Sequence, residues 1–296
     1  MARFAASLVL AGWGRPVRAA SPLGGGMNSA TALVDLADQR AVLKWVRDSS
    51  AGALAADCEV AQRLARHGLI TGEPLPTAAG ELIYRAEVGA VALLRFVDGS
   101  PLSPTSPRDQ HDLAVTLAAV HAVEATRKSG LFMSDPVVEL VHDVEPWVRP
   151  TVDRVLDEYH HLPELTWGLL HADPAPDAFR RRPETDQVAL IDWSSTTRGP
   201  VLYDVASALM YLGGRRNAAS FWEAYVGHSP APSSELADHL GALTRYRAAV
   251  QAAYFSWRIA TVDDTGIRDH DENWKGLRDA ELMLRTNDAE IVTQLQ

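Results

Sequence analysis

Two neighbouring stretches of this chain carry its most informative pattern: residues 169–179 read LLHADPAPDAF, and residues 189–209 read ALIDWSSTTRGPVLYDVASAL. In each stretch an apolar run leads into an aspartate, Asp173 in the first and Asp192 in the second. We predict a short β-hairpin that places the two carboxylates at adjacent ends. Such a pair can share a cleft, where Asp173 accepts the proton of a substrate hydroxyl and Asp192 binds magnesium. Considered one at a time, the two aspartates are equally well explained as ordinary turn residues.

Upstream, a lysine lies on a predicted strand and an acidic residue lies on the helix that follows. The apolar patterns predict three strands and then a helix, at residues 17–22, 30–34, 41–46 and 51–67. Lys44 lies in the third strand between apolar neighbours, and a buried lysine needs an acidic partner. We assign that partner to Glu59 on the helix. The alternative is an edge-strand lysine that is exposed to water.

The turn between the first two strands is rich in glycine, with the sequence GGGMNS at residues 24–29. Backbone N–H groups in such a turn can approach phosphate oxygens closely. We therefore assign nucleotide binding to four of its residues, Gly25, Gly26, Asn28 and Ser29. Taken alone, three glycines are more often just a turn. The chain contains no GxxxxGK(S/T), which excludes a Walker-type phosphate loop.

Beyond a turn at residues 98–101, which we predict to be a hinge, the pattern becomes helical. Apolar residues recur at helical spacing in seven segments, residues 110–123, 136–148, 152–159, 203–212, 218–226, 234–260 and 273–285. The chain therefore reads as a small strand-rich lobe followed by a larger helical lobe that contains a β-hairpin.

The composition favours a globular protein that binds neither nucleic acid nor membranes. The chain has 296 residues and a net charge of -10. An acidic surface repels nucleic acid and anionic lipid, and no apolar run approaches the roughly 20 residues that span a bilayer. The single cysteine, Cys58, allows no intramolecular disulfide, which fits a cytoplasmic location. Residues 4–11 weakly resemble a signal peptide, but GWGRP at residues 12–16 interrupts the pattern.

The two quoted stretches resemble the catalytic segment of the aminoglycoside phosphotransferase and choline kinase-like superfamily. That family shows H-G-D-x-x-x-x-N, then I-D-W or I-D-F, then G-P-x-x-Y-D-x-A. The upstream order also matches: the glycine turn, AVLKWV at residues 41–46, the helix with Glu59, LLRFVDGSPL at residues 93–102, and LAAVHA at residues 117–122. The resemblance covers most of the chain, about residues 17–212. It is specific in the catalytic segment and unspecific in the glycine turn.

This resemblance implies an α+β, protein kinase-like bilobal fold. A small N-terminal lobe would hold an antiparallel sheet and a helix, and a larger, mostly helical C-terminal lobe would hold the catalytic β-hairpin. Residues 1–97 would form the nucleotide-binding lobe, and residues 98–296 the catalytic and acceptor-binding lobe. The implied activity is transfer of the γ-phosphate of ATP, or of GTP, to a hydroxyl group of a small molecule with Mg²⁺. An aminoglycoside or another antibiotic is one class of acceptor, and antibiotic resistance would be one outcome of its phosphorylation.

The resemblance also implies a role for individual residues. Asp173 would be the catalytic aspartate, and His171 would support its loop through hydrogen bonds. Asp192 would bind Mg²⁺. Lys44 would bind the α- and β-phosphates of the nucleotide. Asp204 would be a structural support for the catalytic loop.

One position departs from the family pattern. The family's second Mg²⁺ ligand is an asparagine, and its position here holds Ala178, which cannot bind a metal. Asp177 could take over, because a carboxylate is a good ligand for Mg²⁺. Otherwise one metal suffices, or the chain is a pseudokinase-like protein that binds a ligand without turnover.

The acceptor, the choice between ATP and GTP, and the oligomeric state stay open at this stage. Acidic groups within residues 139–145 and 263–272 could attract a cationic acceptor in a cleft. Such groups are more often solvated helix ends and loops, so a neutral or monocationic acceptor is an alternative. A metal-dependent hydrolase using His160, His161, His171 and Asp173 lacks the expected ligand spacing, and a serine hydrolase lacks GxSxG.

Overall fold

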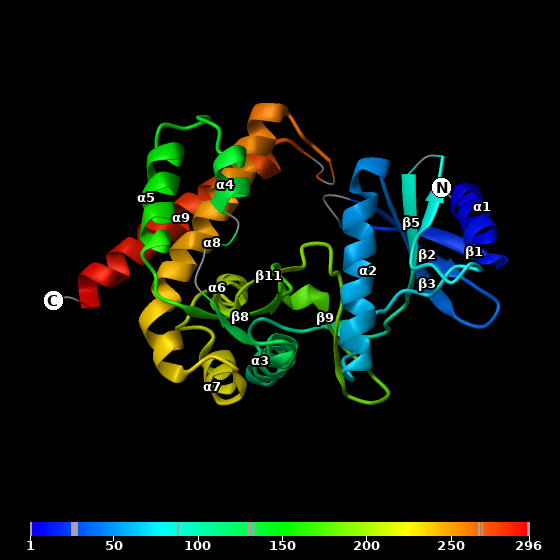
Figure 1. Ribbon diagram of the computed structural model, residues 1–296, viewed down its shortest axis with the longest axis horizontal. Helices are drawn as coiled ribbons and strands as arrows, with labels where there is room; N and C mark the ends of the chain where they lie inside the picture. The colour runs from blue at the N-terminus through cyan, green and yellow to red at the C-terminus, as the bar shows by residue number, and fades with distance from the viewer. Residues whose placement is uncertain are drawn as a thin grey trace. The chain divides into compact units, whose positions relative to one another are not determined.

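The chain folds as two compact units, Met1–Thr116 with Ala175–Thr196 and Leu117–Pro174 with Thr197–Gln296. The computed structural model describes residues 2–24, 29–87, 89–128, 132, 134–265, 267 and 269–294. Each unit combines helices with antiparallel strands, and Figure 1 labels most of these elements. The predicted division into functional lobes at residues 97 and 98 stays a prediction.

A five-stranded antiparallel sheet is the centre of the first unit. Its strands lie in the order β1-β2-β3-β5-β4. In that order their bounds are Ala19–Leu23, Ala30–Asp35, Arg40–Val46, Gly89–Arg95 and Tyr84–Ala86. The three strands predicted first along the chain are therefore present, with bounds that differ by at most two residues.

One helix packs on each face of this sheet. α1 (Ala2–Trp13) packs with Val91 of β5, and α2 (Ala51–Arg66) packs with Ala92 of the same strand. Because side chains alternate along a strand, these two residues point to opposite faces. The stretch that weakly resembles a signal peptide is thus part of α1, and its residues Ala5, Leu8 and Val9 are buried against the sheet.

Three short strands hold the segment around Asp192. They form a sheet in the order β10-β9-β6, with bounds Val188–Leu190, Phe179–Arg181 and Ser100–Pro101. Two short segments of the first unit, η1 (Asp48–Ser50) and η2 (Pro176–Ala178), are 3-10 helices among its described residues. β10 is anchored because the backbone N–H of Leu190 donates to the carbonyl of Ile70 (2.9 Å).

The strand before Asp173 belongs to a different sheet from the strand before Asp192. β8 (Leu165–Leu170) leads into Asp173 and pairs with β7 (Thr126–Lys128) and β11 (Thr197–Pro200) in the second unit. The prediction of one hairpin with an aspartate at each end is therefore wrong. The hairpin is β9–β10, because the residues just before β10 supply a partner at a smaller loop-closure cost.

The second unit is mostly helical. Its helices α4 to α9 have the bounds Ser134–Leu140, Val148–His160, Val201–Tyr211, Ala219–His228, Ser233–Thr261 and Asp271–Gln294, and α3 (Pro107–Ala122) passes into it from the first unit. α8 packs against α5, α6 and α9 (Figure 1). The predicted helix at residues 136–148 is wrong beyond Leu140, because Pro146 disfavours helical backbone there. Within the described ranges no helix is both long and apolar enough to cross a bilayer.

Candidate active site

Lys44 lies on β3 and forms an ion pair with Asp192. Its Nζ donates a hydrogen bond to Oδ1 of Asp192 at 3.1 Å. Lys44 is only 7% exposed, whereas 58% of the Asp192 side chain is exposed. Burying an ammonium group is unfavourable unless it is paired, so Asp192 stabilises Lys44 in this position. The structure thus brings together two residues that the sequence analysis assigned to the nucleotide and the metal.

The backbone and a neighbouring hydroxyl fix the Asp192 side chain. The residue follows β10 with a φ of 64°, in the left-handed region that aspartate tolerates better than most residues. Ser194 Oγ donates to the same Oδ1 at 2.8 Å. The carboxylate is therefore directed by three features: a strained turn, a hydroxyl and a buried ammonium group.

The acidic residue of α2 that interacts electrostatically with Lys44 is Asp57, where the sequence predicted Glu59; the hydrogen-bonded partner of Lys44 is Asp192. Glu59 is exposed and forms no ion pair with Lys44 among the described residues. Asp57 is half-buried, and burial raises its pKa from 3.8 to about 6; Lys44 opposes this rise and Asp192 adds to it. Residues 57 and 59 point about 200° apart on a helix, so only one of them can face the sheet. The sequence held the signal, because Asp57 lies at helical spacing from the buried Leu54.

A buried network in the second unit fixes the loop that carries Asp173. The backbone N–H groups of His171 and Ala172 donate to the carboxylate of Asp204 at 2.7 and 2.8 Å. His121 is hydrogen-bonded to Asp204 through Nε2 (3.1 Å) and to the hydroxyl of Tyr225 through Nδ1 (2.7 Å). Asp204 and His121 are fully buried. The predicted support of the loop by Asp204 is confirmed.

The Asp173 side chain is half exposed and is held by two residues that the sequence analysis missed. Tyr211 Oη donates to Oδ1 of Asp173 at 2.5 Å, and Nη2 of Arg247 lies 3.8 Å from the same oxygen. Burial lowers the pKa of the Arg247 guanidinium, but Tyr203, Tyr211 and Asp173 outweigh it and leave the pKa raised. The sequence held one signal, because Arg247 lies at helical spacing from the buried Leu243 of α8.

The remaining predicted residues lie apart from these contacts. Asp177 is exposed on η2 and has no hydrogen bond to any described residue. Ala178 is buried, and its carbonyl accepts the backbone N–H of Ile191 at 2.9 Å. Ser29 lies directly before β2 and is half-buried. Gly25, Gly26 and Asn28 lie outside the described residues.

Asp192 has the donor chemistry that Mg²⁺ requires. The described part of the chain contains no group of three or more His, Cys, Asp or Glu side chains placed to bind a metal. Mg²⁺ commonly uses one or two carboxylates and completes its shell with water and phosphate oxygens. An exposed carboxylate with a fixed orientation fits that pattern.

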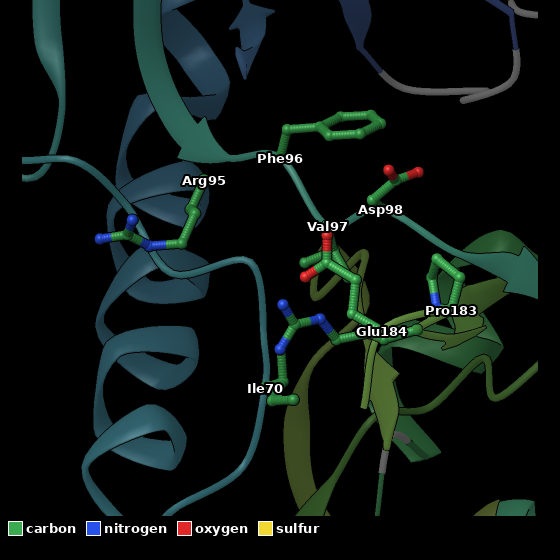
Figure 2. Close-up of a pocket in the computed structure, with 8 residues that line it drawn as sticks. Ile70, Arg95, Phe96, Val97, Asp98, Pro183 and Glu184 are labelled. Atoms are coloured by element: carbon green, nitrogen blue, oxygen red, sulfur yellow. The ribbon is translucent and has the colours of Figure 1, made fainter. Parts of the chain in front are cut away.

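A pocket of about 210 Å³ lies at the predicted hinge in the first unit (Figure 2). It is lined by Ile70, Arg95, Phe96, Val97, Asp98, Arg182, Pro183 and Glu184. Arg40 stacks on Phe96, with its guanidinium carbon 4.2 Å from the ring centre, and pairs with Asp98 at 3.2 Å. None of the predicted site residues lines this pocket.

The first unit holds a buried lysine paired with an aspartate, and the second unit holds another aspartate on a loop fixed by Asp204. These are residue types that phosphoryl transfer uses. The model of the phosphotransferase enzyme family matches residues 19–258. The chain belongs to this family. The resemblance drawn from its motifs and the predicted class of enzyme are confirmed.

Several solved structures of small-molecule kinases share the fold. Spectinomycin phosphotransferase, in complex with ADP and spectinomycin, aligns with a TM-score of 0.68 and 12% identity over 98% of both chains. A microcompartment-associated aminopropanol kinase aligns with a TM-score of 0.69 and 16% identity over 98% of both chains. An amicoumacin kinase with AMP-PNP and Ca²⁺ aligns with a TM-score of 0.69 and 12% identity over 90% of this chain and 88% of that one.

These alignments confirm the predicted α+β, protein kinase-like fold. No curated protein sequence matches the chain. Nothing in the comparisons supports the alternative of a ligand-binding protein without turnover.

Proposed function

We propose that the chain is a kinase that transfers the γ-phosphate of a nucleoside triphosphate to a hydroxyl group of a small molecule, with Mg²⁺. The ion pair between the buried Lys44 and the exposed Asp192 carries this proposal. It sets a fixed positive group beside a carboxylate that can bind a metal, and phosphoryl transfer needs both. Membership of the phosphotransferase enzyme family supports it independently.

In the nucleotide half of the reaction, Lys44 would bind the α- and β-phosphates. Asp57 would take the role expected of Glu59 and steady the ammonium group from α2. Asp192 would hold Mg²⁺, with Asp177 as a candidate second ligand in place of Ala178. The metal would neutralise the negative charge that builds up on the phosphate oxygens.

In the acceptor half of the reaction, Asp173 would orient the attacking hydroxyl and accept its proton. Aspartate is a weak base, so the rate gain comes mainly from orientation. His171 and Asp204 would keep the loop of Asp173 in place. The glycine turn, with Gly25, would cover the phosphates.

The acceptor is proposed as a hydroxyl compound, and a cationic one is the first class to test. The solved structures that share the fold are named as kinases that act on spectinomycin, aminopropanol and amicoumacin. ATP is the first donor to test and GTP the second, and a cytoplasmic location stays a prediction.

The test is release of ADP by the purified full chain with Mg²⁺ and ATP. The acceptor panel contains spectinomycin, kanamycin, choline and 1-amino-2-propanol, with GTP as a second donor. We expect acceptor-dependent ADP release that EDTA abolishes. Asp173→Asn should lower turnover by about a hundredfold or more and leave the affinity for ATP within about twofold.

Two further variants sharpen this test. Asp157→Asn, which replaces an exposed carboxylate of α5, is the control for Asp173→Asn. Its turnover should equal that of the wild type. Asp177→Ala should raise the Mg²⁺ concentration needed for half-maximal activity, and an unchanged requirement would remove Asp177 from the metal site. Wild-type turnover in Asp173→Asn would refute the proposed mechanism.

A further inference from the structure

Among the residues that the structure describes, those that hold the carboxylate of Asp173 approach the same oxygen, Oδ1. Tyr211 donates a hydrogen bond to Oδ1, and the shortest approach of Arg247 is also to Oδ1, whereas no described residue is hydrogen-bonded to Oδ2. We propose that Tyr211 and Arg247 are positioning residues, which fix Oδ1 so that Oδ2 accepts the proton of the acceptor hydroxyl. This inference rests on the proposed function and adds two residues to it.

Within the described ranges, the carboxylate that pairs with Arg247 is that of Asp173. Only 11% of the Arg247 side chain is exposed, against 50% for Asp173. Its Nε donates to Ser207 Oγ at 2.8 Å and its Nη1 to Gln251 Oε1 at 3.3 Å, both neutral groups. Asp173 supplies the acidic group within 4 Å of this guanidinium in the described ranges. Because a buried guanidinium strongly favours a carboxylate, the pair restrains Asp173 as well as stabilising Arg247.

The two residues belong to helices that pack against each other. Tyr211 is the last residue of α6, and Arg247 lies in the middle of α8. Figure 1 labels these two helices, which are in contact. Ser207, one turn before Tyr211, accepts the hydrogen bond from Arg247. Gln251 extends this chain of contacts to α9, where it donates to the carbonyl of Gly276 at 3.1 Å. Residues on packed helices hold a reactive group more accurately than residues on loops.

The contacts of Tyr211 and Arg247 with Asp173 complement the support that Asp204 gives to the loop. Asp204 fixes the backbone at His171 and Ala172, whereas Tyr211 and Arg247 fix the side chain of Asp173. The second torsion angle of an aspartate is soft, so a fixed backbone alone leaves the carboxylate free to rotate. When Tyr211 and Arg247 hold Oδ1, the carboxylate can no longer rotate about its second torsion angle, and Oδ2 points in one direction.

This orientation matters at the moment of transfer. The hydroxyl oxygen of the acceptor bonds to the γ-phosphorus, and the bond from that phosphorus to the β–γ bridging oxygen breaks. The nucleoside diphosphate leaves with the electron pair of the broken bond. The hydroxyl proton moves to Oδ2 of Asp173 and passes to water after the product departs. A misdirected Oδ2 would slow this step without changing how tightly the nucleotide binds.

Arg245 on the same helix provides a matched control. It is also mostly buried, with 9% of its side chain exposed, and it pairs with Glu158 instead of Asp173. Arg247→Gln and Arg245→Gln therefore remove the same group from similar surroundings. The assay uses the full chain with Mg²⁺, ATP and whichever of spectinomycin, kanamycin, choline or 1-amino-2-propanol turns over fastest, or water as acceptor if none does.

We expect Arg247→Gln to lower kcat by about 10- to 100-fold, with the KM for ATP within about twofold of the wild type. Tyr211→Phe should lower kcat by roughly tenfold by the same reasoning. Arg247→Lys, which keeps a positive charge, should retain more activity than Arg247→Gln. Arg245→Gln should change kcat by less than about twofold while lowering Tm about as much as Arg247→Gln does.

Each outcome decides between the two proposals. Equal losses of kcat in Arg247→Gln and Arg245→Gln would reduce Arg247 to a structural role and overturn the inference. A wild-type kcat in Tyr211→Phe would overturn the part assigned to Tyr211. In both cases an inactive Asp173→Asn variant would leave the proposed function standing. If the wild-type chain releases no ADP with any acceptor or with water, the proposed function fails, and this inference fails with it.

Discussion

Replacing Asp57 by asparagine should make the protein more stable at pH 8 and leave its stability unchanged at pH 4. Burial raises the pKa of the Asp57 carboxyl from 3.8 to about 6 in the folded state. Between these two values the folded chain binds the proton more tightly than the unfolded chain. Stability therefore falls as the pH rises from about 4 to about 6, and the loss persists above that range. Asparagine carries no charge and avoids the loss.

The size of the effect follows from the same pKa. Without solvent screening, a rise from 3.8 to about 6 corresponds to about 3 kcal/mol at pH 8. Because Asp57 is only half-buried, water screens the charge, and we expect about 1.5 kcal/mol. For a chain of this length that corresponds to an increase in Tm of about 3 °C. We expect Lys44, which pairs with Asp192 in the wild type, to keep that pairing in the variant.

Urea denaturation of the wild type and of Asp57→Asn at pH 4 and pH 8 measures this difference. Glu59→Gln is the matched control, because it removes an exposed carboxylate from the same helix and should shift stability by less than about 0.5 kcal/mol. The KM for ATP should rise in Asp57→Asn and stay unchanged in Glu59→Gln. A stability gain of the same size at both pH values, or an equal gain in Glu59→Gln, would refute the reasoning.

Two further predictions concern buried groups. Asp204→Asn replaces a carboxylate oxygen with an amide donor that faces a backbone N–H of His171 or Ala172; it should lower the unfolding free energy by about 2–4 kcal/mol, and an unchanged midpoint in urea would contradict the network. Burial raises the pKa of the Cys58 thiol from 9.0 to about 12, so the thiolate at pH 8 should be about a thousandfold scarcer than for a free thiol. Cys58 should react with an aromatic disulfide reagent only after unfolding, and rapid labelling of the native chain would be the opposite result.

The spacing of apolar residues along the sequence predicted most of the helices and strands. Strands β1, β2 and β3 and helices α2, α6 and α8 lie close to their predicted bounds, because apolar spacing reports which face of each element is buried. The helix predicted at residues 136–148 failed at Pro146, where local backbone sterics outweigh apolar spacing. Apolar patterns also gave the wrong partner strand for β10. They locate strands along the chain, but they do not show which strands pair.

The candidate site was predictable only in part. The motif pointed to Asp173 and Asp192, and the strand pattern pointed to Lys44; the pairing of Lys44 with Asp192 is present in the structure, and the catalytic and metal-binding roles stay predictions. Choosing Glu59 over Asp57 ignored the direction in which each side chain leaves the helix. Tyr211 and Arg247 lie 38 residues and farther from Asp173 along the chain. No local pattern links such distant positions, so their contact with Asp173 required the fold.

Helix α1 has a practical consequence for anyone who trims this protein. It lies ahead of residue 19, where the match to the family begins. Its Trp13 donates from the indole nitrogen to the carbonyl of Leu75 at 2.7 Å, and its apolar face shields Val91 and Leu93 from water. An expression clone that starts at residue 19 would lay bare one whole side of the sheet and invite precipitation. Clones should therefore begin upstream of α1, and purification tags are better placed where they leave that helix seated.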